Sequence, residues 1–541
     1  MGVRRGASRE APRRGNCDGG GFSLRKRRRT RGRQAGGYVM LGRLFRRKSN
    51  HPARPTRWEL SDELLRWSGD DAWTLRDAVE GTLILGATGS GKTSGSGATI
   101  ARSYLSSGFG GLVLTAKSDE RALWESYCRE TNRLGDLVVV GPDAECRFNF
   151  LDHELNRTGS GAGLTENIVT LFSNVMEIRE RNAGSGSGRE DGDFWKQGAL
   201  KCMRNAVDLV SLATGKVSVP DLVNVVLSAP LTPEQIREKL WQERSYCFHC
   251  LVEALDKSKT PRQEHDFGVV CDYYILEWPN LSERTRSVIQ ATFMGWADLL
   301  VRGLLRELFC TDTTITPEAV ESGKIILIDL PVKEFGEVGQ FAQVLFKYCF
   351  QRSIERRKVA ESPRPAFLWA DEAQNFVTSY DMMFQTTCRA ARVATVLLSQ
   401  NYSNFTAGLG GNAKAQAETD SLLANLNTRI FHANGDPVTN HWASSLIGKS
   451  RQFMMNGNSR CDDDDDQWLA ALGLDWMCRG AGASAGFNEV LEHEVQPREF
   501  TRLCTGGPAN GWFVDGIVFQ NGRMFAGSGR TWLKTAFRQK A

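Results

Sequence analysis

The stretch Gly86-Ala-Thr-Gly-Ser-Gly-Lys-Thr93 fits the pattern G-x-x-x-x-G-K-[ST] at every fixed position. The apolar run Thr82 to Leu85 leads directly into it, and a helical segment that stops at Gly108 comes next. Glycines let successive backbone N–H groups converge on phosphate oxygens, and the next helix adds its positive N-terminal end. The stretch therefore predicts a phosphate-binding loop between a strand and a helix.

In such a loop the Lys92 ammonium reaches the terminal phosphates, and the Thr93 hydroxyl ligates Mg²⁺. The predicted cofactors are therefore ATP and Mg²⁺. ATP is preferred over GTP only through the family resemblance described below, because no motif reads the base. The predicted nucleotide-binding residues are Gly86, Ala87, Thr88, Gly89, Ser90, Gly91, Lys92, Thr93 and Ser94.

Phe367-Leu-Trp-Ala-Asp371-Glu372 is predicted to be a strand that ends in paired carboxylates. Asp371 would orient Mg²⁺ and its waters, and Glu372 would polarise the attacking water. An isolated Asp-Glu pair could equally cap a helix. Together with a phosphate-binding loop, the pair favours an ATPase that turns over.

Gln400 comes directly after the apolar run Val393–Ser399, at the carboxyl edge of the predicted sheet. It would sense the γ-phosphate or position water, or simply end the strand with a polar residue. Arg389 is expected near the end of the preceding helix, where it would reach a neighbouring subunit's nucleotide or form a surface salt bridge. The candidate catalytic residues are Lys92, Glu372, Gln400 and Arg389, and the candidate metal ligands are Thr93 and Asp371.

Strand-sized apolar runs alternate with helical stretches. Besides Thr82–Leu85 they are Leu112–Thr115, Leu137–Val140, Lys324–Leu330, Phe367–Ala370 and Val393–Ser399. This pattern is typical of a mainly parallel sheet covered by helices, so the predicted fold class is α/β. We expect a basic tail at 1–50, the first part of a nucleotide-binding domain at 51–154, an all-α insertion at 155–318, and the second part of that domain at 319–541.

Charge is distributed unevenly along the chain. Residues 1–50 hold 16 Lys and Arg against two acidic residues, a net charge of +14; the remainder carries −9. The tail would contact nucleic acid or anionic lipid, or remain solvated and disordered, and it is absent if translation starts at Met40. No run approaches the roughly 18 apolar residues that span a bilayer, and no apolar signal segment is present, so we expect a cytoplasmic protein.

The 13 cysteines lack the dense spacing of a disulfide scaffold. Cys247 and Cys250, with His249, His265 and Cys271 nearby, suggest zinc, but their irregular spacing favours ordinary buried residues. The run Asp462–Asp466 indicates a solvated acidic loop. Three tryptophans of the helical region are predicted to pack in a core rather than stack on bases: Trp195, Trp278 and Trp296.

In their order, these motifs resemble those of the TraG/TraD-type coupling ATPases of type IV secretion and conjugative DNA transfer. The matching stretches are Gly86–Thr93, Gly110–Lys117, Phe148–Asp152, Lys324–Arg357 with Asp329-Leu-Pro331, Asp371–Gln374, Leu398–Gln400 and Leu426–Ile430. The resemblance spans about residues 55–535, and the helical insertion matches mainly in position and size.

The resemblance implies a RecA-like P-loop NTPase that forms a homo-hexamer and couples a relaxase–single-stranded DNA complex to a type IV secretion channel. It implies that the insertion contacts the relaxosome or its DNA, that Arg389 is the trans-acting arginine, and that Arg429 is a second candidate. Most relatives carry transmembrane helices before the motor domain, whereas we expect none here. Association with the inner face of the cell membrane would then depend on a partner.

Two other functions stay open. One is a soluble FtsK/HerA-like DNA translocase, against which the helical insertion argues. The other is a substrate receptor that uses ATP only to assemble and sorts protein cargo without translocating DNA. Asp371, Glu372 and Gln400 argue against this receptor, because their chemistry serves hydrolysis.

Overall fold

The computed structural model describes residues 58–182, 190–460, 472 and 482–539. The predictions for the tail at 1–50, for Met40 and for the acidic run Asp462–Asp466 lie outside these residues.

Strands and helices alternate at the start of the described chain. The elements are β1 Glu63–Arg66, β2 Ala72–Thr74, α1 Leu75–Val79, β3 Thr82–Leu85, the π-helical turn Thr93–Gly97, α2 Ala98–Ser106, β4 Gly110–Leu114, α3 Glu120–Glu130 and β5 Leu137–Val140. The described residues between β5 and the next strand form helices and turns. These helices are α4 Phe150–Asn156, α5 Thr165–Asn182, α6 Glu190–Thr214, α7 Val219–Ser228, α8 Lys239–Arg244, α9 Tyr246–Asp256, α10 Pro261–Cys271, α11 Trp278–Asn280, α12 Glu283–Ala297 and α13 Gly303–Phe309.

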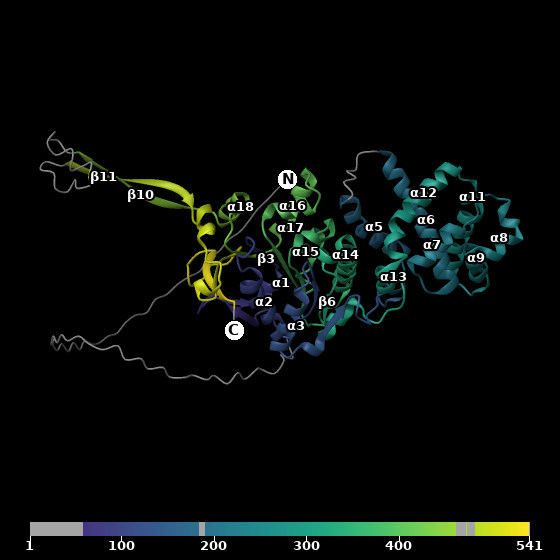
Figure 1. The fold of residues 1–541 in the computed structure, drawn as a ribbon, viewed down its shortest axis with the longest axis horizontal. Coiled ribbons are helices and arrows are strands. Elements are labelled where there is room, and N and C mark those ends of the chain that lie inside the picture. The colour runs from purple at the N-terminus through teal and green to yellow at the C-terminus, as the bar shows by residue number, and fades with distance from the viewer. Residues whose placement is uncertain (1–57, 183–189, 461–471, 473–481, 540–541) are drawn as a thin grey trace, which may run out of the picture. The chain divides into compact units, whose positions relative to one another are not determined.

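Strands return after α13. The elements are β6 Ile325–Ile328, α14 Val332–Arg356, β7 Ala366–Ala370, α15 Ser379–Thr387, β8 Val393–Ser399, α16 Tyr402–Gly408, α17 Ala413–Ala424, β9 Thr428–Phe431, α18 Pro437–Ile447, β10 Lys449–Arg460, β11 Gly482–His493, β12 Phe513–Gln520 and β13 Trp532–Arg538. Strands β10 and β11 pair with each other as a two-stranded antiparallel sheet (Figure 1).

The main sheet has nine strands in the order β13-β12-β9-β3-β8-β7-β4-β6-β5. The run from β9 to β5 is parallel throughout, and β12 and β13 add an antiparallel edge beside β9. The predicted α/β class with a mainly parallel sheet is therefore confirmed. The predicted runs gave the bounds of β3, β5 and β8 to the residue, and those of β4, β6 and β7 to within two residues.

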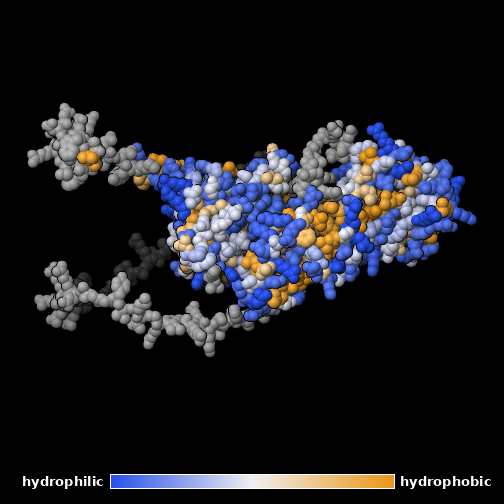
Figure 2. Space-filling model, in the orientation of Figure 1, coloured by the Kyte–Doolittle hydropathy of each residue, from blue (hydrophilic) through white to orange (hydrophobic). Residues whose placement is uncertain are grey.

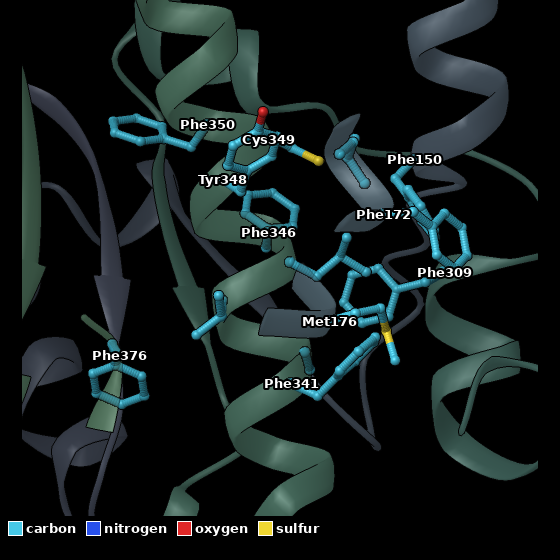
Figure 3. Packing of buried hydrophobic residues seen from close by; sticks show 14 of the residues in the cluster. Phe150, Phe172, Met176, Phe309, Phe341, Phe346, Tyr348, Cys349, Phe350 and Phe376 are labelled. Carbon is cyan, nitrogen blue, oxygen red and sulfur yellow. The ribbon is translucent and has the colours of Figure 1, made fainter. Parts of the chain in front are cut away.

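Both faces of the sheet are buried, because alternate residues of each strand enter different hydrophobic clusters. Leu83 and Leu85 of β3 belong to one cluster, while Ile84 between them belongs to the other. The second cluster contains Tyr104 of α2 and Trp124 of α3. The first cluster is built on α14 and extends into the helical region; Figure 3 shows Phe341 and Phe346 of α14 on the side of Phe150, Phe172 and Phe309, while Phe350 points to the other side of α14. This two-sided burial explains why the strands are continuously apolar.

The helices between β5 and β6 pack on one another around α6. Helix α6 contacts α7, α9, α10 and α12. Trp278 and Trp296 are buried in this core and Trp195 packs against it, as predicted. The boundaries 155–318 of the insertion remain a prediction.

Hydrophobic side chains also reach the surface of the helical region. Figure 2 shows apolar patches among hydrophilic residues on the viewed face. A cavity of about 200 Å³ opens among Trp241, Phe248, Leu251, Phe267 and Tyr274. Large exposed apolar side chains of the same segment include Leu240, Leu255 and Leu276.

No single helix among the described residues has the length and hydropathy to cross a membrane; two pairs of helices joined at sharp bends reach those values only when taken together. Cys247 and Cys250 are buried, free thiols, and no group of three or more metal-binding side chains gathers anywhere in the described ranges.

Candidate nucleotide-binding site

The register of the parallel strands brings four chain segments to one edge of the sheet. Leu85 at the end of β3 pairs with Ser399 at the end of β8, and Ala370 at the end of β7 pairs with Leu397 of β8 and Leu114 of β4. The segments that come after these strands therefore meet at the carboxyl edge, where open α/β sheets bind ligands. Strand β8 lies between β3 and β7.

The segment after β3 forms the predicted loop. Gly89 and Gly91 have φ angles of +75° and +83°, and a Cβ on Gly91 would lie 2.5 Å from a methyl carbon of Val514. Among the described residues, no backbone carbonyl accepts from the N–H groups of Thr88, Gly89, Gly91 or Lys92. These donors can therefore serve phosphate oxygens. The next residues form a helical turn that continues into α2, which adds the positive end of a helix dipole.

Thr93 and Asp371, the two predicted metal ligands, contact each other. The Thr93 hydroxyl donates to a carboxylate oxygen of Asp371 over 2.9 Å. Adjacent ligands of an octahedral Mg²⁺ ion, each about 2.1 Å from the metal, lie about 3 Å apart. The pair thus has the oxygen donors and the spacing to hold Mg²⁺ beside a bound phosphate chain.

Glu372 is buried and surrounded by donors. Lys117 Nζ lies 3.1 Å and Lys92 Nζ 3.9 Å from its Oε1 atom, while Gln374 donates to Oε2 over 3.0 Å. The Gln400 amide is 3.4 Å from Oε2, a long hydrogen bond. Burial would raise the pKa of Glu372, but the Gln374 hydrogen bond and the charges of Lys92 and Lys117 lower it below the usual value. The carboxylate is therefore ionised at neutral pH, as a group that polarises water requires.

The backbone of Glu372 also points to a constrained site. Its φ of 48° and ψ of 50° place it in the left-handed region, which non-glycine residues rarely adopt. Its N–H donates to Asp371 Oδ1 over 2.8 Å, which ties the Asp371 carboxylate to the backbone of Glu372. Strain of this kind persists only where the surroundings hold it.

Lys117 and Glu120 come after β4 and add two titratable groups that the site predictions did not include. Lys117 Nζ is also 3.6 Å from Asp371. Partial burial would lower the pKa of Lys117, but the charges of Asp371 and Glu372 raise it above the usual value. The signal for Lys117 was present in the Gly110–Lys117 match, whereas Glu120 lies beyond it. Without the strand order, however, the sequence does not place the end of β4 beside the end of β7.

His432, directly after β9, supports the helix that continues the loop. Its buried ring bridges the Ser96 hydroxyl, 2.7 Å away, and the Asp515 carbonyl oxygen, 2.8 Å away. Burial lowers the pKa of His432 to about 4, so the ring is neutral and donates one bond while it accepts the other. Ser94 accepts a hydrogen bond from Gln539 over 2.8 Å, which ties the loop to the end of the described chain.

Within the chain, the two candidate arginines, Arg389 and Arg429, lie apart from the group of side chains around Glu372. Arg389 comes after α15, its side chain is 57% exposed, and it lies 3.2 Å from Glu80. Arg429 is buried and donates to the carbonyl oxygens of Leu423 and Ala424. The Arg429 guanidinium is therefore used inside the chain, which does not fit the second trans-acting candidate.

Together, the loop, the Thr93–Asp371 pair and the ionised Glu372 have the arrangement of a P-loop nucleotide site at the edge of a mainly parallel sheet. Comparisons with known proteins agree with this class. Residues 365–467, which include Asp371, Glu372 and Gln400, match the family model described as the TraM recognition site of TraD and TraG. No curated protein matches the chain.

Solved structures of one bacterial protein are similar over most of the chain. The unbound conjugative coupling protein TrwBdeltaN70 is 14% identical, with a TM-score of 0.55, and the match covers 89% of this chain and 90% of that one. The plasmid coupling protein TrwB with the GTP analogue GDPNP is 13% identical, with a TM-score of 0.53 and coverage of 89% and 91%. TrwB with ADP and Mg²⁺ is 14% identical, with a TM-score of 0.53 and coverage of 87% and 88%.

At these identities, the structural similarity shows the fold. It confirms the RecA-like P-loop architecture that the resemblance implied. The family match and the structural matches together support the resemblance to the TraG/TraD-like coupling protein family.

Glu120 predicts a pH dependence of stability. Burial, and secondarily the charge of Asp371, raise the pKa of its carboxyl group to about 8. The folded protein then holds this proton more tightly than the unfolded chain, so its stabilising contribution is complete below about pH 4.5 and is lost as pH rises towards 8. Between about pH 4.5 and 8, Glu120 contributes about −1.4 kcal/mol per pH unit to the slope of the unfolding free energy.

Denaturant unfolding at several pH values tests this. Glu120→Gln should remove the Glu120 contribution to the pH dependence of the unfolding free energy, because an amide does not titrate. Its amide oxygen can still accept from the Ala116 N–H, which in the parent donates to Glu120 over 3.0 Å, so the variant should fold. Glu125→Gln, on the same helix but with a side chain 32% exposed, is the matched control and should retain the Glu120 contribution. An unchanged slope in Glu120→Gln would show that another group titrates.

Proposed function

We propose that this chain is an ATP-hydrolysing coupling protein. It recruits a relaxase–single-stranded DNA complex to a type IV secretion channel and drives its transfer in conjugation. The observation that carries the proposal is the 2.9 Å contact between Thr93 and Asp371, with Glu372 beside Lys92. This contact joins the loop that would hold a triphosphate to the carboxylates that would cleave it.

The chain's own residues have distinct parts in the reaction. The loop N–H groups and Lys92 bind the phosphates, Thr93 and Asp371 hold Mg²⁺, and Glu372 orients and polarises the attacking water. Gln400, directly after β8, positions that water or senses the γ-phosphate. Mg²⁺ supplies charge neutralisation on the phosphate oxygens. TrwB has been solved with ATP and GTP analogues and with ADP and Mg²⁺, which supports the same ligands here.

The proposed partners are derived from the family match. The matching model is described as the TraM recognition site, so we assign residues 365–467 to contact with a relaxosome-related protein. We also propose that the chain contacts channel components, and that a partner attaches it to the inner face of the cell membrane. The protein is then cytoplasmic or peripheral at that membrane face.

We further propose a homo-hexamer in which Arg389 completes a neighbour's site. The Arg389 side chain is 57% exposed and that of Glu80 is 17% exposed, so the arginine end of their ion pair is open to water. Asn427 also donates to Glu80 over 2.7 Å, so Glu80 keeps a hydrogen-bond partner when Arg389 exchanges it for phosphate in an adjacent subunit.

Two substitutions separate binding from hydrolysis. The parent protein should hydrolyse ATP, and single-stranded DNA should stimulate it. Lys92→Ala should lose nucleotide binding, whereas Glu372→Gln should bind nucleotide normally and lose roughly 10²- to 10⁴-fold in turnover. Glu361→Gln removes an exposed carboxylate and should behave as the parent.

Full turnover in Glu372→Gln would refute the role of Glu372 in hydrolysis. Stimulation of ATP hydrolysis by relaxase but not by single-stranded DNA would favour the substrate receptor.

Concentration dependence tests the role of Arg389. Specific activity should rise with protein concentration as rings assemble, and Arg389→Ala should flatten that rise while nucleotide still binds. Arg498→Ala, which alters another exposed arginine paired with an acidic residue, is the control and should leave the rise unchanged. Concentration-dependent turnover retained in Arg389→Ala would assign the residue to its salt bridge alone.

A further inference from the structure

Two ammonium groups compete for one carboxylate oxygen at the candidate site. Glu372 Oε1 lies 3.1 Å from Lys117 Nζ and 3.9 Å from Lys92 Nζ. The side chains of Lys92 and Glu372 are 7% and 8% exposed, so water screens their attraction little. The Glu372 carboxylate nevertheless lies closer to Lys117 than to Lys92, the lysine of the loop.

The chain holds Lys117 firmly in this place. Strand β4 pairs with β7, so the segment after β4 emerges beside Asp371. The backbone N–H and carbonyl oxygen of Thr115 are both hydrogen bonded to the buried Gln343 side chain of α14, at 2.6 and 2.8 Å. The Ala116 N–H donates to Glu120 over 3.0 Å. Lys117 therefore extends from an anchored backbone.

Removal of the Lys117 charge would change the balance of forces on Glu372. Its Oε1 atom would keep only Lys92 as a neighbouring cation, and Coulomb attraction strengthens as the separation decreases. The Gln374 bond holds the other oxygen, so Oε1 can close on Lys92 without breaking that bond. A direct ion pair with Glu372 would withdraw Lys92 from the phosphates.

We propose that Lys117 is a positioning residue that draws Glu372 away from Lys92 and so keeps the loop lysine available for the triphosphate. This inference rests on the proposed function, since it assigns a part in nucleotide binding at the same site. Lys117 acts through Glu372, so its effect on nucleotide affinity depends on the Glu372 charge.

Titration of the full chain with a fluorescent, non-hydrolysable ATP analogue and Mg²⁺ tests this in a double-mutant cycle. Lys117→Met, and likewise Lys117→Gln, should weaken binding roughly tenfold, while Lys117→Arg should retain the parent affinity. In the Glu372→Gln background, Lys117→Met should have no further effect. Lys333→Met, which alters an exposed lysine whose backbone N–H donates to the Ala116 carbonyl oxygen, is the matched control and should bind as the parent.

The outcomes distinguish the inference from the proposed function. Parent protein that binds no nucleotide would overturn both. Parent binding with unchanged affinity in Lys117→Met and Lys117→Gln would overturn the inference alone. Equal losses from Lys117→Met with and without the Glu372 charge would also overturn it, because Lys117 would then contact the nucleotide itself.

Discussion

The alignment of strand ends in the parallel sheet is the constraint on which the candidate site depends. Strands β3, β8, β7 and β4 end within two residues of one another in register, so the loop, Gln400, Asp371 and Lys117 emerge at one edge. A slip of one strand by one residue would turn its side chains to the opposite face. The two buried clusters specify the register, because each strand sends alternate apolar residues into each of them.

Charge balance is the second requirement. Asp371 and Glu372 are buried next to each other, and buried carboxylates are costly unless paired. Lys92, after β3, and Lys117, after β4, supply two positive charges. Gln374 and Thr93 supply hydrogen bonds. Because a metal–phosphate complex also brings both signs of charge, the cluster can exchange its internal pairs for ligand contacts.

The sequence predicted the parts of the fold that depend on local pattern. The apolar runs located six of the seven parallel strands described in the main sheet, but not β9, where Arg429 interrupts the apolar pattern. The loop and the paired carboxylates were recognisable by spacing. The antiparallel strands β12 and β13 were not located, because Asp515 and Gly516 interrupt the apolar residues of β12 and because β13 is largely exposed. Lys117, Glu120 and His432 were missed for another reason: their proximity to the loop or to Asp371 is set by strand order, which no local pattern encodes. The burial of Arg429 is likewise a tertiary property.

The position of the metal, in a crystal structure with a non-hydrolysable ATP analogue and Mn²⁺ in place of Mg²⁺, decides whether the loop and the paired carboxylates form one site. We expect one anomalous peak about 2.1–2.2 Å from Thr93 Oγ1, with Asp371 bound to the same ion directly or through one water. The γ-phosphate should lie between that ion and Lys92. A metal bound away from Thr93 and Asp371, or a triphosphate seated outside the loop, would contradict the proposed site.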